Sequence, residues 1–316
     1  MISATKQTIS IIGFGHVGTA VFFALTNQIK HSLIHVNDPA ADLSGRLLDL
    51  SHAAAIRNNE VVFNDQEILE QSEIIFFCAG YSNKTNESRT AVAQKNHELI
   101  HEIFSSLTFN TKPDIFVLTN PVEACCYWIK KEQPKARIIG TGTALDTFRL
   151  KFILSKKFNN PIKNIETYVI GEHGETMFPL WSLTRVNGLP LEISEAEKDN
   201  ITTELRNSAR EIRKTEVATK YGVAQVAVEL FLMLKSSASS IIPIAVKQKN
   251  SVYLGIEDGD FINLPTIIGK DKYKVIHPNN WTAEELELLR ISIAQTRQCI
   301  AHSASDWSGN KTKTLG

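Results

Sequence analysis

A glycine pattern close to the amino terminus constrains this chain more than any other stretch. Gly13-x-Gly15-x-x-Gly18 follows a short apolar run, residues 9–12, and precedes a helical pattern that reaches about Lys30. Gly13 permits a tight turn, Gly15 lets the backbone approach a pyrophosphate, and Gly18 lets the helix pack closely on the strand. A glycine turn in some other strand–helix unit is the alternative. Because strand, turn and helix follow in this order, the pattern predicts a dinucleotide-binding unit with the anion at the helix N-terminus.

The next apolar run, residues 33–36, ends in two polar residues, Asn37 and Asp38. They lie roughly 20 positions beyond the third glycine, where dinucleotide-binding folds place an acid on the adenosine ribose hydroxyls. An acid there favours NAD over NADP, because the 2′-phosphate of NADP would meet like charge. Polar residues that simply end a strand are the alternative. We expect Asn37 and Asp38 to bind the cofactor, together with His16 and Val17 of the glycine turn.

Apolar runs alternate with helical patterns as far as residue 143. This alternation predicts the α/β class, a Rossmann-type, doubly wound parallel sheet with helices on both faces. Ligands bind beyond the carboxyl ends of the strands in such sheets. Ala79, Gly80 and Asn120 fall at those ends. We therefore expect them beside the cofactor.

The second half of the chain has a different pattern, typical of an α+β domain. The expected elements are helices over 144–158, 194–221, 222–235 and about 282–302, and antiparallel strands within 251–268. Ser194 and Thr282 each stand three residues before a glutamate, which is the spacing of a capping box. We predict a dinucleotide-binding domain over 1–143 and a catalytic domain over 144–316.

Charge and cysteine content exclude several classes of function. Lys and Arg together number 34, and so do Asp and Glu, so no net charge recruits nucleic acid or an anionic membrane. No apolar run approaches the ~20 residues that span a bilayer, and the first residues lack the apolar core of a signal peptide. The four cysteines have no C-x-x-C spacing and the nine histidines are scattered. We expect reduced thiols, no metal site and a cytoplasmic protein.

Three residues of the second half suit proton transfer next to a carboxylate. His173 lies between Gly171 and Gly174 after a predicted strand, and a histidine can donate or accept a proton near neutral pH. Asp146 and Arg149 stand at i and i+3 of a predicted helix and share one face. The acid can fix the tautomer of the histidine, and the guanidinium can bind a carboxylate through two parallel hydrogen bonds. A structural histidine and an ordinary intrahelical ion pair are the alternatives.

A polar loop in the first half, residues 81–89, carries a further cation, Arg89. A loop of this composition can close over a substrate, exclude water and bring a guanidinium to a polarised carbonyl. A solvated loop with a surface arginine is the alternative. Both interpretations fit the loop taken by itself.

Taken together, these motifs resemble the L-lactate/malate dehydrogenase family over nearly the whole chain and in the same order. The residues that carry the resemblance are Gly13-x-Gly15-x-x-Gly18, Asp49-Leu50-x-His52, Ala79-Gly80, Glu87-Ser88-Arg89, Thr119-Asn120-Pro121-Val122, Gly140-Thr141-Gly142-Thr143-x-Leu145-Asp146 and Gly171-Glu172-His173-Gly174. The L-lactate and L-2-hydroxyisocaproate dehydrogenases are the most similar branch, notably over residues 140–146 and 265–269. The resemblance implies an NAD-dependent oxidoreductase.

The resemblance also implies roles for single residues. It makes His173 the proton donor to a 2-oxo group, with Asp146 as the residue that orients it. Arg149 would hold the substrate carboxylate, while Arg89 would polarise the carbonyl from the closing loop. These four residues form the implied catalytic set.

Further implied contacts surround that set. Asn120 would touch both the substrate and the nicotinamide ribose, and its bond to Pro121 is expected to be cis. Thr219 would line the pocket beside the substrate side chain, and Val223 would pack on the nicotinamide. Asn83 would face the same side chain from the loop.

Three positions depart from the family's pattern. Asn83 stands where lactate enzymes have Gln and malate enzymes have Arg, so a second carboxylate has no partner and malate is disfavoured. Asn is also shorter than Gln, which leaves room for larger side chains than the methyl group of pyruvate. Asn37, rather than Asp38, aligns with the ribose-binding acid, which implies a weaker preference for NAD. Lys151 and Glu166 replace the Arg and His that bind fructose 1,6-bisphosphate in activated relatives, so we expect no activation.

The expected function is reversible hydride transfer between NADH and pyruvate, which gives L-lactate. A 2-hydroxyisocaproate-type enzyme for larger 2-oxo acids is the alternative; a malate dehydrogenase or a non-catalytic NAD-binding protein is disfavoured. The expected partners are a small-molecule substrate and further copies of the chain, as a homodimer or homotetramer. The apolar helix over 222–235 is compatible with a subunit interface or with burial inside the chain.

Overall fold

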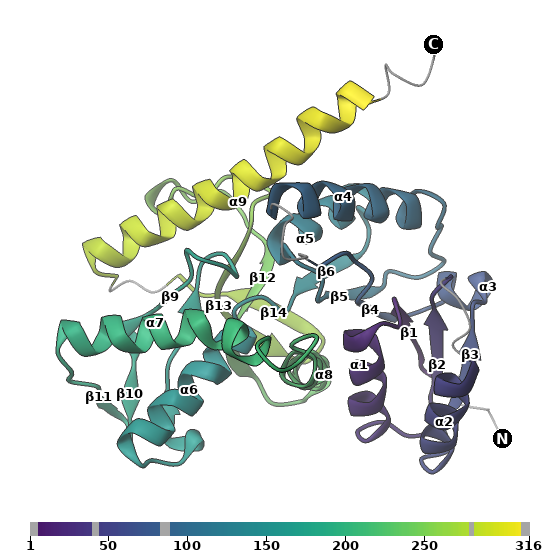
Figure 1. Cartoon of the computed structure of the whole chain (residues 1–316), viewed down its shortest axis with the longest axis horizontal. Coiled ribbons are helices and arrows are strands. Elements are labelled where there is room, and N and C mark those ends of the chain that lie inside the picture. The colour runs from purple at the N-terminus through teal and green to yellow at the C-terminus, as the bar shows by residue number, and fades with distance from the viewer. Residues whose placement is uncertain (1–5, 40–43, 83–88, 278–280, 311–316) are drawn as a thin grey trace.

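Six short apolar strands of the first half form a parallel sheet. They are β1 (Thr8–Ile12), β2 (Leu33–Asn37), β3 (Glu60–Phe63), β4 (Ile74–Phe77), β5 (Asp114–Val117) and β6 (Arg137–Gly140). The computed structural model describes residues 6–39, 44–82, 89–277 and 281–310. The strands lie in the order β3-β2-β1-β4-β5-β6, which is the doubly wound arrangement predicted from the alternating pattern (Figure 1). The fold class is therefore confirmed.

The helices between these strands are α1 (His16–Thr26), α2 (Ser44–Ala55), α3 (Gln66–Glu70), α4 (Arg89–Ser105) and α5 (Val122–Glu132). The helices that follow are α6 (Ala144–Phe158), α7 (Glu195–Ile212), α8 (Tyr221–Lys235) and α9 (Ala283–Asn310), with single 3₁₀ turns η1 (Ile162–Asn164), η2 (Trp181–Leu183) and η3 (Val252–Leu254).

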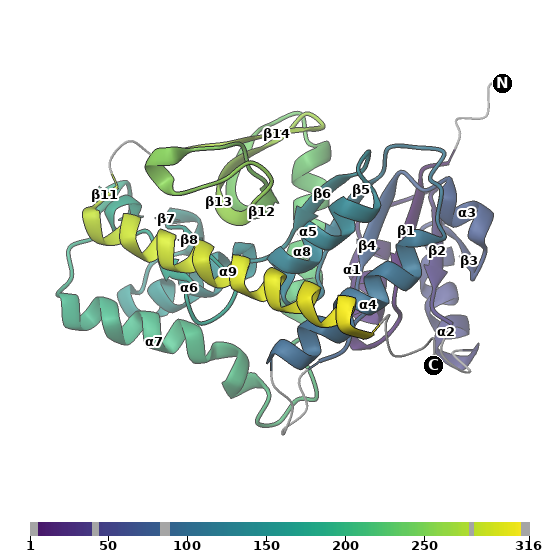
Figure 2. The same cartoon turned by 90° about the horizontal axis from the view of Figure 1, so that it is seen from above.

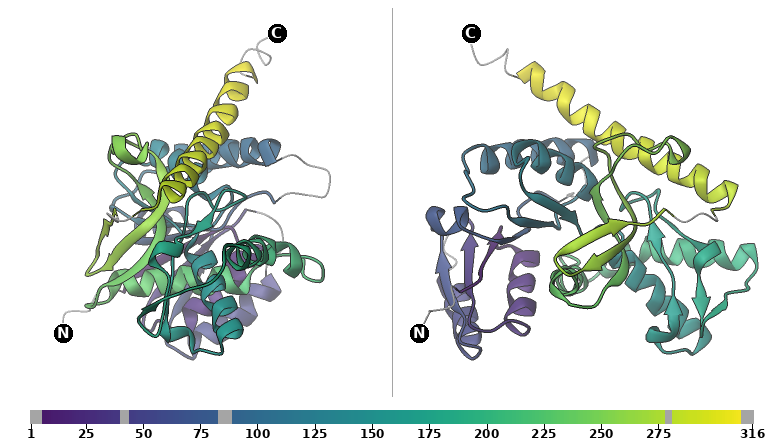
Figure 3. Two further views of the ribbon diagram at one scale, coloured as in Figure 1. Left: turned by 90° about the vertical axis from the view of Figure 1, so that its left-hand side faces the viewer. Right: turned by 180° about the vertical axis from the view of Figure 1, so that it is seen from behind.

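Helices cover both faces of the parallel sheet because successive strand residues point to opposite faces. Ile11 and Phe76 belong to the apolar cluster formed with α1 and α8. Ile12 and Phe77 belong to the cluster formed with α4 and α5. All four side chains are buried. α9 runs over α4 and α5, as Figure 2 shows, and its last turns extend past the rest of the molecule (Figure 3).

The sheet continues into the second half through three antiparallel strands, β12 (Ser240–Lys247), β13 (Phe261–Gly269) and β14 (Lys272–Val275). β12 joins the edge of β6, where Ala245 lies opposite Gly140. The two predicted domains thus share one nine-stranded sheet. Short strands complete the second half: β7 (Ile165–Glu166), β8 (Val169–Ile170), β9 (Phe178–Pro179), β10 (Arg185–Val186) and β11 (Leu189–Pro190). The boundary at residue 143 stays a prediction.

Two predicted elements of the second half were wrong in extent. The helix expected over 194–221 ends at Ile212, and residues 213–220 form a turn before α8. The β-branched residues of that turn, among them Val217 and Thr219, disfavour helix. The prediction overlooked them because the charged residues continue the helical pattern into the turn. The antiparallel strands expected within 251–268 shrink to β13, because its partner is the upstream strand β12, which was not predicted.

Both predicted capping boxes lie at helix starts, but only one is complete. Thr282 Oγ1 accepts from the backbone N–H of Glu285, whose carboxylate accepts from the backbone N–H of Thr282 in return, at 3.1 and 3.0 Å. At α7 the hydroxyl of Ser194 accepts from Glu197, whose carboxylate pairs with Lys157 instead. Among the helices of the described residues, none combines the length and apolar character needed to cross a membrane.

Candidate active site

The glycine turn between β1 and α1 leaves an open cradle for an anion. Gly13 has a φ of +89°, and a Cβ there would lie 2.4 Å from the backbone nitrogen of Ala79. A Cβ on Gly15 would meet nothing within 4 Å, so the space beside this residue is free. No side chain caps the N-terminus of α1, which leaves its first N–H groups available. This geometry fits the pyrophosphate of a dinucleotide.

The end of β2 is tied to the glycine turn. The carbonyl of Asn37 accepts from the N–H of Gly13 at 2.8 Å, and the carboxylate of Asp38 accepts from the N–H of Phe14 at 2.6 Å. Asn37 and Asp38 therefore stand beside the loop, as the ribose-binding prediction requires. An arginine that the sequence reasoning missed also reaches this loop: Arg46 of α2 donates to the carbonyl of Phe14 at 3.0 Å.

The predicted proton-transfer residues lie together beyond β6 and β8. Asp146 is completely buried in the first turn of α6. Its Oδ2 lies 2.5 Å from Nδ1 of His173, and its Oδ1 accepts from Nη1 of Arg149 at 3.1 Å. His173 and Arg149 keep 19% and 15% of their side chains exposed, so both can still be reached from solvent. The helix therefore holds the buried carboxylate of Asp146 against the partly exposed side chains of His173 and Arg149.

The charges of this cluster support one another. Burial is the largest single influence on His173 and opposes its charge. The facing carboxylate of Asp146, their hydrogen bond and the charge of Glu123 together outweigh burial and raise the pKa of His173 above its usual value. Burial acts against the charge of Asp146 too, yet His173 and Arg149 lower its pKa below the usual range. The hydrogen bond from Nδ1 leaves Nε2 as the outward nitrogen, which has no hydrogen-bond partner among the described residues. The pair can hold a proton and deliver it at that atom.

A buried carboxylate that the sequence reasoning missed supports the histidine loop. Glu123, in the first turn of α5, accepts from the backbone N–H of His173 at 3.0 Å and from Nδ2 of Asn263 at 2.5 Å. Asn263, on β13, also donates to the carbonyl of Gly171 at 2.7 Å and accepts from the N–H of Thr143. The two side chains thus join α5, β13, the start of α6 and the loop that carries His173. Glu123 lies near a predicted strand end, but its burial is what distinguishes it from other acidic residues. Burial cannot be read from the sequence.

Glu123 has an unusual environment for an acid. It is 1% exposed. Burial, helped by the nearby charge of Glu172, raises the pKa of Glu123 to about 7, although His173 and the hydrogen bond from its backbone act in the opposite direction. Its carboxylate therefore changes charge close to neutral pH, directly behind the proton-transfer pair.

A second buried polar residue, Asn96 of α4, joins Tyr81, which follows β4, to Asn120, which follows β5. Its side chain accepts from the N–H of Tyr81 at 2.7 Å and donates to the carbonyls of Tyr81 and Asn120, at 3.1 and 2.7 Å. The Asn120–Pro121 bond is cis, as the family resemblance implied. Asn120 is exposed beyond the end of β5. Asn96 was also missed, because an isolated asparagine in a helical pattern gives no sequence signal.

The remaining predicted site residues are placed only in part. Asn83 lies outside the described residues, and Arg89 is described only as the first residue of α4, without its side chain. Thr219 and Val223 are half-buried, on either side of the start of α8. Gly80 is exposed at the end of β4. Their roles stay predictions.

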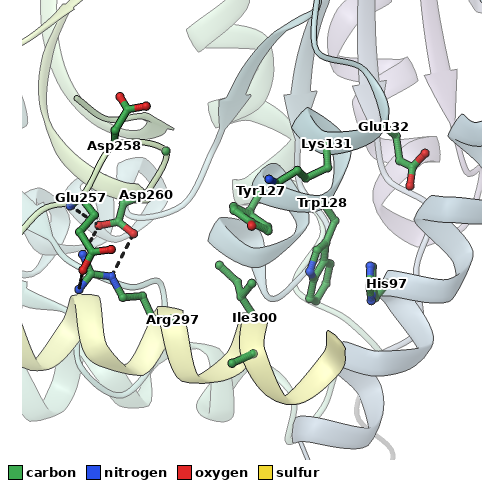
Figure 4. Close-up of a pocket in the computed structure, with 12 residues that line it drawn as sticks. His97, Tyr127, Trp128, Lys131, Glu132, Glu257, Asp258, Asp260, Arg297 and Ile300 are labelled. Carbon is green, nitrogen blue, oxygen red and sulfur yellow. Dashed lines mark hydrogen bonds and ion pairs between the residues drawn. The ribbon is translucent and has the colours of Figure 1, made fainter. Parts of the chain in front are cut away.

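A separate cavity of about 530 Å³ opens away from these residues, between α4, α5, α9 and the loop over 257–260 (Figure 4). None of the predicted site residues lines it. Of its two basic side chains, Lys131 and Arg297, the second is already paired with Asp260 at 2.6 Å and with Glu257 at 3.0 Å. On the opposite wall Trp128 stacks on His97. Four acidic side chains line the cavity against these two basic ones, so it is poorly suited to a carboxylate substrate.

Comparisons with known proteins agree with this architecture. Residues 7–140 match the family model for the NAD-binding domain of lactate/malate dehydrogenases, and residues 143–305 match the model for their alpha/beta C-terminal domain. "L-lactate dehydrogenase 1" of Clostridium acetobutylicum is 33% identical over 282 residues, which cover 85% of this chain and 89% of that protein. The L-lactate dehydrogenase of Borrelia turicatae is 29% identical over 93% of this chain and 98% of its own length. Among solved structures, a lactate dehydrogenase from a Medee basin deep-sea metagenome library superposes with a TM-score of 0.85 at 27% identity, covering 95% of this chain and 99% of its own.

Proposed function

Because the chain belongs to the lactate/malate dehydrogenase family and is an NAD-dependent oxidoreductase, we propose that it reduces pyruvate to L-lactate, reversibly, with NADH. The observation that carries the proposal is the buried carboxylate of Asp146, which holds His173 at 2.5 Å and Arg149 at 3.1 Å. The two outward cations suit a substrate with a carboxylate next to a carbonyl. Relatives named L-lactate dehydrogenase support the choice of substrate.

Each residue has a defined task in this proposal. The reduced nicotinamide, when bound, supplies the hydride to C2 of the 2-oxo acid. His173 donates the proton of Nε2 to the carbonyl oxygen, and Asp146 holds the ring and stabilises its charged form. Arg149 binds the carboxylate of the substrate, and Arg89 stabilises the developing oxyanion from the start of α4. The raised pKa of His173 keeps the proton available for reduction near neutral pH.

The substrate side chain is the second part of the proposal. Asn83 supplies no cation for a second carboxylate, so oxaloacetate is a poor substrate. A 2-hydroxyisocaproate-type activity on larger 2-oxo acids is the second candidate, favoured by the short Asn83. The test is NADH oxidation with pyruvate, 4-methyl-2-oxopentanoate and oxaloacetate. We expect pyruvate to give the highest kcat/KM; the branched acid as the best substrate would favour the second candidate, and oxaloacetate as the best would overturn both.

We also propose that fructose 1,6-bisphosphate does not activate the enzyme. Burial lowers the pKa of Lys151, and the nearby carboxylate of Glu166 acts against this effect. The negative charge of Glu166 thus lies close to Lys151, the only cation of these two residues. At that position Glu166 would repel a phosphate. Activity at neutral pH should be the same with and without millimolar fructose 1,6-bisphosphate. Stimulation by more than about twofold would contradict this proposal.

The enzyme's assembly and location complete the proposal. Phe23 of α1, Leu48 of α2 and Tyr221 of α8 are large apolar side chains that stay more than half exposed on helices that pack around α1. Such a surface supports a homodimer or homotetramer. No disulfide joins the four cysteines, all of which lie in described stretches, and this supports a cytoplasmic location. Light scattering after gel filtration should give a mass of two or four chains.

A further inference from the structure

An exposed arginine, Arg46, stands beside the predicted adenosine end of the cofactor cradle. Three connections converge on the glycine turn. Asn37 accepts from Gly13, Asp38 accepts from the N–H of Phe14, and Arg46 donates to the carbonyl of Phe14. The dinucleotide fold places the ribose hydroxyls at the end of β2, where Asn37 and Asp38 stand. Arg46 therefore stands beside the position of the ribose 2′-oxygen.

Arg46 is available for an anion. It lies in the first turn of α2 and is exposed. Within the described residues its Nη1 donates to the carbonyl of Phe14 at 3.0 Å and to the hydroxyl of Thr19 at 3.5 Å. No carboxylate pairs with its guanidinium in the described parts of the chain. These bonds hold one edge of the guanidinium against the loop and leave its Nη2 and Nε donors for a ligand. A guanidinium fixed in this way suits a phosphate, which it can bind through two parallel hydrogen bonds.

Of the two positions where an acid would repel the phosphate, Asn37 has no charge and Asp38 is already hydrogen-bonded. Asn37 is neutral, so it offers a hydrogen bond to a ribose oxygen without a like charge. The carboxylate of Asp38 is turned to the glycine turn, where it accepts from the N–H of Phe14 at 2.6 Å. That bond disperses part of its charge.

We infer that Arg46 and Asn37 form a subsite for a ribose 2′-phosphate, so that the enzyme accepts NADPH as well as NADH. This inference rests on the proposed cofactor site but not on the identity of the 2-oxo acid. Arg46 bonds the phosphate oxygens, while Asn37 bonds the neighbouring ribose hydroxyl. The established use of NAD is retained, because an unliganded Arg46 stays solvated and exposed.

Binding of nucleotide fragments tests the subsite without any turnover. Adenosine 2′,5′-bisphosphate and 5′-AMP differ in the 2′-phosphate alone, and their dissociation constants follow from displacement of fluorescent NADH. We expect the unmodified enzyme to bind the bisphosphate at least as tightly as 5′-AMP. The variant R46Q should weaken the bisphosphate by about tenfold or more relative to 5′-AMP, the loss expected for a charge-assisted bond to phosphate. N37D should weaken it as well, because a carboxylate then faces the phosphate.

A matched control uses the same helix. Arg57 follows the far end of α2, about 16 Å away along the helix at 1.5 Å per residue. R57Q removes the same charge and should leave both dissociation constants, and the ratio of kcat/KM for NADPH and NADH, within about twofold. In R46Q that ratio should fall by about tenfold or more. Equal losses for the two fragments in R46Q and R57Q, or a bisphosphate bound more than a hundredfold more weakly than 5′-AMP by the unmodified enzyme, would overturn the subsite. Fragment binding as expected without reduction of any 2-oxo acid would overturn the proposed function alone.

Discussion

Two histidines of this molecule, one in each half, show how surroundings decide what an imidazole can do. His35 lies inside β2, where the hydroxyl of Ser10 lies 2.9 Å from Nδ1 and the backbone N–H of Asp65 donates to Nε2 at 3.1 Å. His173 lies on the loop after β8, with a carboxylate on Nδ1 and an outward Nε2. The side chain of His35 is completely buried, whereas 19% of the His173 side chain is exposed.

The two pKa values move in opposite directions for reasons that the contacts explain. Burial lowers the pKa of His35 to about 4, and the charge of Asp65 opposes this only weakly. Burial acts in the same direction on His173, but the charge of Asp146, its hydrogen bond to the ring and the charge of Glu123 together raise the pKa of His173. Both nitrogens of His35 are also occupied by neutral partners. A buried histidine without a carboxylate on its ring is therefore a neutral structural residue, whereas one with a carboxylate and a free nitrogen can carry a proton.

Replacement of His173 should have the largest effect on turnover. H173N keeps the approximate size of the side chain but cannot donate a proton at the position of Nε2. We expect kcat for pyruvate reduction to fall by about 10³-fold, within the range for loss of a general acid. NADH binding, followed by fluorescence, should change by less than about threefold, because His173 is not part of the cofactor cradle. Retention of more than a tenth of the turnover would contradict the role of His173.

The next largest effect is expected at Asp146, the carboxylate that His173 has and His35 lacks. D146N keeps the hydrogen-bonding shape but removes the charge that holds the proton on His173, so the kcat of reduction should fall by about 10²-fold. The pKa of His173 should also fall toward that of a buried, unpaired histidine. An NMR titration of the imidazole, assigned with H173N, measures this. An unchanged titration would show that burial by itself sets the protonation of His173.

Much of this contrast could be predicted from the sequence. Glycines on either side of His173 and the i, i+3 spacing of Asp146 and Arg149 are local patterns, and the structure brings these three residues together. The parallel sheet was also predictable, because buried strands appear as continuous apolar runs. The cofactor turn followed from three glycines whose spacing has a steric cause.

The supporting residues could not be predicted, because their partners are distant in the sequence. Glu123 meets His173 across 50 positions and Asn263 across 140. Arg46 reaches Phe14 across 32 positions, and nothing in its local pattern distinguishes it from a solvated surface arginine. β12 escaped prediction because its pairing with β13 and β6 is a long-range property. Tertiary contacts decide these cases, and local propensity does not record them.

The first histidine should affect stability rather than turnover. His35 has a pKa of about 4 when folded and 6.5 as its ordinary value. The unfolded chain binds the proton first, so the contribution of His35 is complete above pH 6.5 and is lost as pH falls toward 4, by up to about 3 kcal/mol. H35Q should therefore weaken the pH dependence of the free energy of unfolding between pH 7 and 5, measured with urea. H52Q, which replaces an exposed histidine of α2, should leave that dependence unchanged. An unaltered dependence in H35Q would mean that His35 is already protonated in the folded state.

The smallest effect is expected at Glu123, which contacts the backbone of His173 rather than its ring. E123Q keeps an oxygen that can accept from the backbone of His173 and from Asn263, but it removes a charge that raises the pKa of His173. Because the pKa of Glu123 is about 7, that charge is mostly present above neutral pH. The alkaline limb of kcat/KM for pyruvate reduction should therefore move to lower pH, by less than about one unit, since Asp146 remains the dominant partner.

The limits of the Glu123 effect follow from its neighbours. Glu172 faces Glu123 from the same loop as His173 and also disfavours its charge, so the variant relieves repulsion as well as removing attraction. Stability should consequently change little or rise, whereas the pH profile shifts. E132Q, at the half-buried last residue of α5, where Glu132 pairs with His101 rather than with the histidine loop, removes a charge from the same helix and should leave the profile in place. A limb that stays fixed in E123Q, or moves to higher pH, would show that Glu123 supports the loop without influencing its proton. The contrast between the two histidines would then depend on Asp146 alone.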